Sequence, residues 1–357
     1  MSTRKQNKVL AAENKTPSFP STRYQGSKVK LVPWLKECLK DLDFDTALDA
    51  FGGTGSVAYM LKQMGKAVTY NDILKFNAVM ADAIIGNASE RLDDNETDQL
   101  LRIHEARKYQ DVVQRNFQGI FYTDDENAWI DRVVQNIPSL PTEARQAIAF
   151  AALFQACLIK RPFNLFHRKN LYLRLNDVPR GFGNKATWDR PFRDHFLKFI
   201  REMNGAVFDN DRANRVLNTE ALEIDGPFDL VYMDPPYLRD TGVGVDYLEF
   251  YHFLEGLTKY EIWESRIDTT SKHRRILHEK PIWCDPARVT DAYKRFFDRY
   301  HESIIAVSTR SDGLPTVPEI KSLLSGHGKK VTIHEYGKYT YALSTNRASK
   351  EILILGT

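Results

Sequence analysis

A tetrapeptide with useful chemistry follows a strongly β-like run of residues, 228–233. In Asp234-Pro235-Pro236-Tyr237, the two prolines stop the strand and leave the backbone carbonyls free of ladder hydrogen bonds. The Asp234 carboxylate and the Pro235 carbonyl can then accept both hydrogens of an amino group conjugated to a purine ring, which makes that nitrogen a better nucleophile. Tyr237 can stack on the base. The alternative is a rigid turn that ends in a surface tyrosine.

A glycine-rich turn lies earlier in the chain, between a short apolar strand and a helical pattern. It contains Asp49, Phe51, Gly53, Thr54 and Gly55. Glycines let a ligand approach the backbone, and the first N–H groups of the following helix face that ligand. A nicotinamide site would normally carry a third glycine, and Asp49 would repel a pyrophosphate. The turn therefore favours a ligand with a cationic centre, and the alternative is a tight turn that binds nothing.

A second acidic residue, Asp72, follows the next predicted strand, 67–70. An acid at this distance from the glycine turn commonly binds ribose hydroxyls. Open α/β sheets bind ligands outside the carboxyl ends of their strands, so we expect Asp72, the glycine turn and the tetrapeptide at that edge.

These motifs resemble, in type and order, those of the Dam-like (alpha-group) DNA adenine N6-methyltransferases, whose amino-terminal motif corresponds here to Tyr24-Gln25-Gly26-Ser27-Lys28. The resemblance implies methyl transfer from S-adenosylmethionine to the 6-amino group of an adenine flipped out of double-stranded DNA, without a metal. It makes Asp234, Pro235, Pro236 and Tyr237 the catalytic residues. The donor-binding residues are then Tyr24, Gly26, Lys28, Asp49, Phe51, Gly53, Thr54, Gly55, Asp72 and Glu220. Glu220 is included because the family usually places an acid before the catalytic strand, and here the segment 218–222 offers that one.

The same resemblance, with a strand–helix–strand pattern around the glycine turn, predicts an α/β fold. We expect a Rossmann-like S-adenosylmethionine-dependent methyltransferase fold, with a mixed sheet and helices on both faces. After a flexible segment, 1–22, the catalytic domain is predicted to comprise 23–85 and 203–357. The mostly helical residues 86–202 are predicted to form a target-recognition insertion, with helix starts near 123–126 and 141–143. Further strands are expected at 303–308, 331–336, 339–344 and 351–355.

Cations alternate with aromatic residues from 160 to 193, and a basic run occupies 272–275. This composition is typical of contact with phosphates and bases, although basic loops and solvated faces also occur without a ligand. The predicted DNA-binding residues are Lys160, Arg161, Arg168, Lys169, Arg174, Lys272, Arg274 and Arg275. The glycine-rich segment 241–245 is either a flap that closes over the flipped base or a flexible surface loop.

Composition sets broad limits on the protein. The chain has 357 residues, of which 42% are hydrophobic, and a net charge of +3, which permits but does not require binding to a polyanion. Cys38, Cys157 and Cys284 lie far apart, so neither a disulfide framework nor a zinc site is expected. Because no long apolar run occurs, we expect a cytoplasmic protein, bacterial or nucleoid-associated, without a membrane partner.

Several alternatives stay open at this point. The tetrapeptide also suits methylation of the cytosine 4-amino group or of RNA. The glycine turn alone would suit a nicotinamide-dependent oxidoreductase, and a DNA-binding relative without catalysis is a third alternative. The motifs do not distinguish a solitary methylase from one that works beside a cognate restriction endonuclease.

Overall fold

The structure, a computed structural model, describes four stretches of chain, 17–176, 185–238, 246–338 and 349–357. Four predicted features lie wholly or partly outside them. These are the start of the segment 1–22, the middle of the basic stretch at 177–184, the loop 241–245 and the strand 339–344.

A seven-stranded sheet with the order β3-β2-β1-β4-β5-β7-β6 forms the centre of the catalytic part. Its strands are β1 (Thr46–Asp49), β2 (Ala67–Asn71), β3 (Arg215–Leu217), β4 (Leu230–Met233), β5 (Ile304–Arg310), β6 (Val331–Lys338) and β7 (Lys350–Gly356). The first five are parallel, whereas β7 runs antiparallel between β5 and β6. The sheet is therefore mixed, as predicted, and the parallel strands end at one common edge.

Alternate side chains of the strands enter two different cores, because successive residues of a strand point to opposite faces. In β1, Ala47 belongs to one core and Leu48 to the other, and in β4 Tyr232 and Val231 divide in the same way. Both faces of the sheet are thus buried, as the near-continuous apolar sequences of these strands require.

Helices cover both faces of the sheet. On one face lie α1 (Val32–Leu39), α2 (Ser56–Gln63) and α3 (Lys75–Ala81), which a π-helical turn, η1 (Asp82–Gly86), continues. On the other lie η4 (Ala221–Glu223), α13 (Val289–Arg299) and α14 (Val317–Gly326). Helix α1 begins three residues later than the predicted 29–39 because Pro33 stands in its first turn, where a missing N–H costs nothing. This arrangement confirms the Rossmann-like methyltransferase fold.

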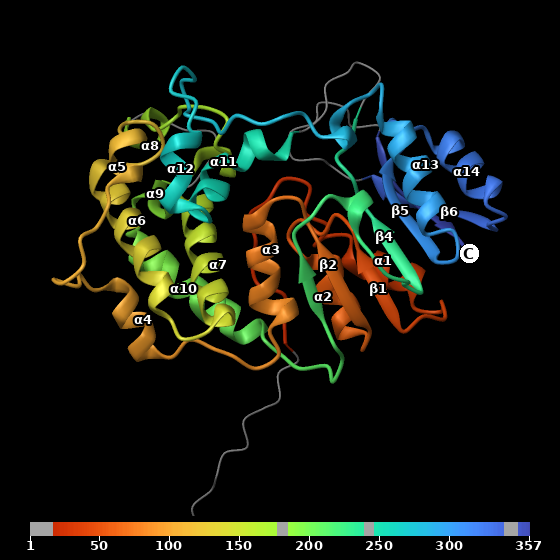
Figure 1. Cartoon of the computed structure of the whole chain (residues 1–357), viewed down its shortest axis with the longest axis horizontal. Coiled ribbons are helices and arrows are strands. Elements are labelled where there is room, and N and C mark those ends of the chain that lie inside the picture. The colour runs from red at the N-terminus through yellow and green to blue at the C-terminus, as the bar shows by residue number, and fades with distance from the viewer. Residues whose placement is uncertain (1–16, 177–184, 239–245, 339–348) are drawn as a thin grey trace, which may run out of the picture.

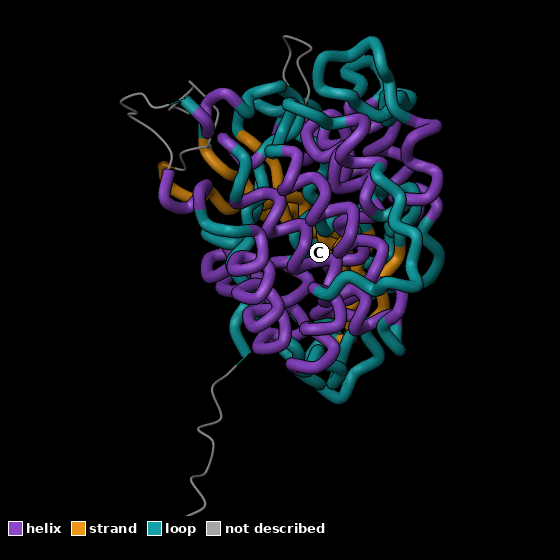
Figure 2. The backbone as a smooth tube through the Cα atoms, turned by 90° about the vertical axis from the view of Figure 1, so that its left-hand side faces the viewer, coloured by secondary structure: helices purple, strands orange, loops and turns teal. Residues whose placement is uncertain are grey.

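A helical part lies beside the α1–α3 face, at the left of Figure 1, and in front of the strands in Figure 2. Two of its helices begin where predicted, since Thr123 and Thr142 accept hydrogen bonds from the first turns of α6 and α7. Within the described ranges, no helix combines the length and the apolar character needed to cross a membrane. The elements between η1 and β3 are α4 (Asp94–Leu101), α5 (Val112–Asn116), α6 (Asp124–Asn136), η2 (Ile137–Ser139), α7 (Glu143–Ile159), η3 (Pro162–Asn164), α8 (Tyr172–Leu175), α9 (Lys185–Asp189) and α10 (Phe192–Ala206).

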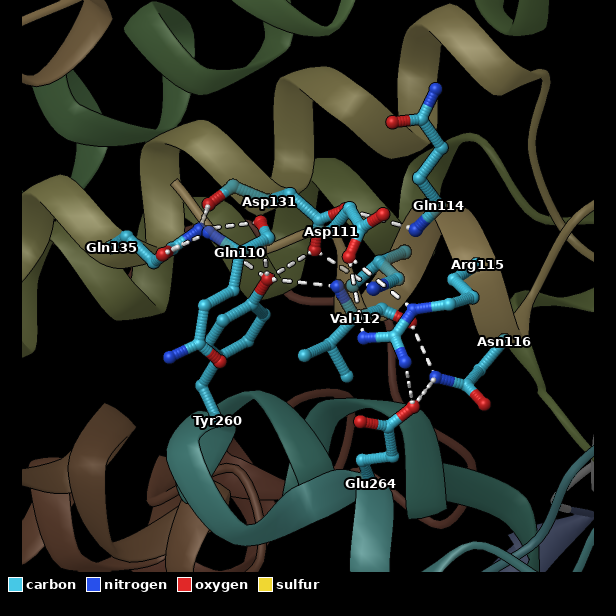
Figure 3. A network of polar contacts seen from close by, with 11 residues as sticks. Gln110, Asp111, Val112, Gln114, Arg115, Asn116, Asp131, Gln135, Tyr260 and Glu264 are labelled. Carbon is cyan, nitrogen blue, oxygen red and sulfur yellow. Dashed lines mark hydrogen bonds and ion pairs between the residues drawn. The ribbon is translucent and has the colours of Figure 1, made fainter. Parts of the chain in front are cut away.

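A second segment of chain joins this helical part. Its elements are α11 (Tyr247–Leu257), α12 (Tyr260–Trp263) and η5 (Glu264–Arg266), and a short turn, η6 (Ile282–Cys284), follows them. The Tyr260 hydroxyl donates to the buried Asp131 carboxylate of α6, and Arg115 of α5 forms an ion pair of 2.6 Å with Glu264 (Figure 3). The segment follows the tetrapeptide in the chain, in a region that the prediction assigned wholly to the catalytic domain. Contacts from α12 and η5 therefore join the chain that follows the tetrapeptide to the helical part.

Candidate active site at the carboxyl edge of the sheet

A cavity of about 330 Å³ opens at the carboxyl ends of β1, β2 and β4. This volume is in the range of small-molecule sites. Three predicted site residues, Gly55, Pro235 and Tyr237, do not line it. The predicted residues that do line it are Tyr24, Gly26, Lys28, Asp49, Phe51, Gly53, Thr54, Asp72, Glu220, Asp234 and Pro236.

The glycine turn is shaped by Tyr70 of β2, whose ring lies directly beneath it. A Cβ atom on Gly52 would be 2.0 Å from this ring, so only glycine fits there. The Tyr70 hydroxyl donates to the Gly53 carbonyl at 2.7 Å. Gly53 and Gly55 have φ angles of 51° and 78°, which favour glycine. Gly55 ends the turn as the N-cap of α2 rather than as a wall of the cavity.

Asp49, at the end of β1, is buried, with 1% of its surface exposed. One carboxylate oxygen accepts a hydrogen bond of 3.1 Å from the Ala58 N–H of α2. The other oxygen is also buried and has no hydrogen-bond partner among the described residues. Burial, together with the negative charge of Asp234, raises the pKa of Asp49 to about 8. The cavity thus contains an acidic group whose second oxygen lacks a donor.

Asp72 follows β2 and holds the rim of the glycine turn. Its carboxylate accepts hydrogen bonds from the N–H groups of Gly53 at 2.9 Å and Leu74 at 2.8 Å. Burial raises its pKa to about 6, although these two hydrogen bonds lower it. The carboxylate is therefore fixed in orientation at the wall of the cavity.

Three parallel tyrosine rings pack together beside the cavity, and two of these, Tyr24 and Tyr247, line it. Tyr247 and Tyr251 were not predicted. Tyr24 stacks on both Tyr251 and Tyr247 of α11, with ring centroids 4.6 and 5.6 Å away, and the two α11 rings lie 6.5 Å from each other. The Gln25 N–H donates to the Tyr251 hydroxyl at 2.7 Å, and a Cβ on Gly26 would lie 2.5 Å from the Tyr247 hydroxyl. The i, i+4 spacing of the two tyrosines was the available signal, because it places both on one helical face.

A cluster of charged groups lies beside the tetrapeptide. Lys28 Nζ is 2.9 Å from Asp234 Oδ1 and 2.9 Å from Glu351 Oε1, and it also contacts the Tyr237 hydroxyl. That hydroxyl donates to Glu351 Oε1 at 2.7 Å. Although burial lowers the pKa of Lys28, the two carboxylates raise it above its ordinary value, so Lys28 is charged. Burial raises the pKa of Asp234 to about 6 despite Lys28, so this carboxyl group is mostly ionised at neutral pH.

An aromatic pair lies near the predicted Glu220. The Trp283 indole N–H donates to Glu220 Oε1 at 2.6 Å, and the Trp283 ring meets Phe51 edge to face at a centroid distance of 4.7 Å. Trp283 lines the cavity but was not among the predicted residues. It comes from η6, where no sequence motif marks it.

Three of the predicted DNA-binding residues are buried, which corrects the prediction. Lys160 and Arg174 each lie 2.7 Å from Glu126, the residue that completes the N-terminal cap of α6. Arg161 is 1% exposed, stacks over Phe121 and donates to carbonyls of its own loop. These cations contact groups inside the helical part and are buried, whereas phosphate contacts require exposed side chains.

The other five predicted DNA-binding residues lie nearer the surface, on two loops beside α11. Arg168, Lys169 and Lys272 are exposed. Arg274 and Arg275 are half-buried, and their guanidinium groups already bind acceptors of the same region, including the Thr269 carbonyl and Asp268. The loops lie close together, because the Phe166 N–H donates to the Phe250 carbonyl of α11 and Arg275 pairs with Glu249 of the same helix.

Known proteins resemble the chain across these motifs. The family described as D12 class N6 adenine-specific DNA methyltransferase matches residues 24–310. The Type II methyltransferase M2.HphI of Haemophilus parahaemolyticus is 27% identical over 327 residues, 89% of this chain and 91% of the relative. The Type II methyltransferase M.FokI of Planomicrobium okeanokoites is 25% identical over 338 residues, 88% of this chain but 48% of that longer relative. Because the family match includes the cavity, the tetrapeptide and most of the sheet, the chain belongs to the D12 class of N6 adenine-specific DNA methyltransferases.

Proposed function

We propose that this adenine-specific DNA methyltransferase binds S-adenosylmethionine in the cavity above the glycine turn. The observation that carries the proposal is the buried oxygen of Asp49 that has no partner, since buried acceptors are normally satisfied and a ligand with donors and positive charge would satisfy this one. Asp72 would hold the ribose hydroxyls. Glu220, Trp283 and Phe51 would hold the donor's adenine by its edge and its face.

The donor, when bound, supplies a methyl group on a positively charged sulfur, and the electrons of the broken carbon–sulfur bond stay with the sulfur. Asp234 and the Pro235 carbonyl accept the two hydrogens of the target amino group, so that its lone pair points toward the methyl carbon. Asp234 then takes the proton that the nitrogen loses. Its raised pKa suits this role, because the group is ionised at neutral pH and still basic.

Tyr237 would stack on the flipped adenine with one face of its ring. Lys28 Nζ lies 4.7 Å from the ring centroid, and the Tyr237 hydroxyl is held by Glu351. We propose that these contacts fix the ring, so that its other face meets the base. Stacking would offset part of the cost of removing the base from the duplex.

Double-stranded DNA would reach the site across the two loops beside α11. Arg168, Lys169 and Lys272 are the predicted cations that the structure leaves exposed there. Lysine and arginine side chains neutralise phosphates without reading sequence, so these three would position the duplex.

The relatives named above are type II methyltransferases, and we propose that this chain likewise belongs to a type II restriction-modification system. Its partner would then be a restriction endonuclease that recognises the same DNA sequence. Methylation by this chain would protect that sequence in the host DNA.

The substitution Asp234→Asn tests the proposed site. It keeps the shape of the side chain but removes its basicity, so single-turnover methyl transfer to duplex DNA should fall at least about a hundredfold. The dissociation constant of S-adenosylmethionine, measured by calorimetry, should change by less than about threefold because Asp49 and Asp72 remain. Asp225→Asn is the matched control, since this exposed carboxylate precedes β4, at the opposite end of the strand from Asp234, and lies away from the cavity. Turnover retained in Asp234→Asn would refute the proposal.

A further inference from the structure

Glu351 is a fully buried carboxylate that belongs to none of the sequence motifs. It is 0% exposed and lies at the start of β7, more than a hundred residues after the tetrapeptide in the chain. One oxygen, Oε1, is within 2.9 Å of Lys28 Nζ, accepts a hydrogen bond of 2.7 Å from Tyr237 and is 3.3 Å from Ser308 Oγ. A buried carboxylate is costly unless such partners hold it, so these contacts fix its position.

The direction of β7 explains how Glu351 reaches the site. Because β7 is antiparallel to its neighbour β5, its first residues lie at the edge where the parallel strands end. Glu351 is paired in register with Arg310, the last residue of β5. A parallel strand in this place would have put its first residues at the opposite edge.

The charges around Lys28 are unequal in number. One ammonium group faces two carboxylates, those of Asp234 and Glu351, at equal distances of 2.9 Å. Its attraction is therefore shared between them. If Glu351 were absent, Lys28 would pair with Asp234 alone and make it a weaker hydrogen-bond acceptor and a weaker base.

We propose that Glu351 is a positioning residue that shares Lys28 with Asp234 and holds the Tyr237 hydroxyl, and so keeps Asp234 a strong acceptor for the amino hydrogens of the target adenine. This inference rests on the proposed function of Asp234. It predicts that Glu351 changes the rate of transfer and its pH dependence without touching the donor, since Glu351 does not line the cavity.

The pH dependence must be read against the other groups that face Asp234. Besides Lys28 and Glu351, these groups are one aspartate and four tyrosines on neighbouring elements. They are Asp49 of β1, Tyr232 of β4, Tyr237 of the tetrapeptide, Tyr247 of α11 and Tyr293 of α13. Glu351→Gln leaves every one of these side chains in place, and glutamine can still accept the Tyr237 hydrogen bond, so a displaced acid limb reports the loss of the Glu351 charge.

The experiment compares pH profiles of single-turnover methyl transfer for the wild-type chain and Glu351→Gln. The glutamine keeps an acceptor for Tyr237 but removes the charge. We expect the plateau rate to fall about three- to tenfold and the acid limb to move to lower pH by about one unit, with donor affinity unchanged within about twofold. Glu335→Gln is the control, because Glu335 lies on the adjacent strand β6 and forms an exposed pair with Lys350, away from the cavity.

An acid limb that stays in place in a folded Glu351→Gln would overturn the inference. Should this variant fail to fold, Ser308→Ala provides the second test. It removes a hydrogen bond to Glu351, which should then attract Lys28 more strongly, so the acid limb should move to higher pH. An unmoved limb in Ser308→Ala would likewise overturn the inference. Failure of the proposed function looks different, because the wild-type chain itself would then show no acid limb and Asp234→Asn would stay active.

Discussion

Replacing Asp49 by asparagine should stabilise the folded protein while it abolishes donor binding. In the folded chain the pKa of Asp49 is raised to about 8 by burial and by Asp234, whereas the pKa of an aspartate in an unfolded chain is about 3.9. Between these values the folded state keeps a proton that the unfolded state releases. The wild-type protein therefore loses stability as the pH rises through this window.

The size of the effect follows from this linkage. Each pH unit inside the window removes about 1.4 kcal/mol from the free energy of unfolding. Asparagine carries no titrating proton, and its carbonyl can still accept the Ala58 N–H bond. Between pH 5.5 and pH 7.5 the stability advantage of Asp49→Asn should thus widen by about 2–3 kcal/mol. Asp72 and Asp234 also titrate, but they do so in both proteins.

Urea unfolding at pH 5.5, 6.5 and 7.5 measures this difference, and calorimetry measures donor binding. Wild-type affinity for S-adenosylmethionine should rise by up to about tenfold per pH unit below pH 8, because a cationic ligand favours the ionised form of Asp49. Asp45→Asn is the control, since Asp45 lies just before β1 and is exposed. The reasoning would be refuted if the stability difference between Asp49→Asn and the wild type did not widen with pH. It would also be refuted if Asp49→Asn bound S-adenosylmethionine as tightly as the wild type.

Two further predictions separate the buried cations from the exposed ones. Arg174→Ala should destabilise the protein by about 3–5 kcal/mol in urea unfolding, because it leaves the carboxylate of Glu126 short of a buried partner; a loss below about 1 kcal/mol would contradict this. The double variant Arg168→Ala/Lys169→Ala should keep its stability but weaken binding to duplex DNA. Its plot of log affinity against log salt concentration should become shallower by nearly two units, and an unchanged slope would exclude both side chains as phosphate contacts.

The fold and the donor side of the cavity could be predicted because their signals are local. Asp49, Asp72 and Asp234 each lie at or just after the end of a predicted strand, and parallel strands bring such residues to one edge. Apolar runs indicated most of the strands, and the N-cap residues Thr123 and Thr142 indicated where α6 and α7 begin. The family match excludes the nicotinamide-dependent oxidoreductase that the glycine turn alone had left open.

The rest could not be predicted because it depends on distant partners. Lys160 and Arg174 were predicted to be surface cations, because nothing near them in the sequence indicates that both are buried in ion pairs with the distant Glu126. Tyr247 reaches the cavity because the first residue of α11 packs against the distant Tyr24. One signal for Glu351 was present: it directly precedes the apolar run 352–355, and strands of that kind are buried on both faces.

The central claim is that the chain transfers methyl groups to the 6-amino group of adenine in duplex DNA. The most direct measurement incubates the chain with radiolabelled S-adenosylmethionine and mixed-sequence duplex DNA, and then separates the digested nucleosides. We predict label in 6-methyladenine, and none when Asp234→Asn replaces the wild-type chain. Label in 4-methylcytosine, or no label in the DNA, would contradict the claim.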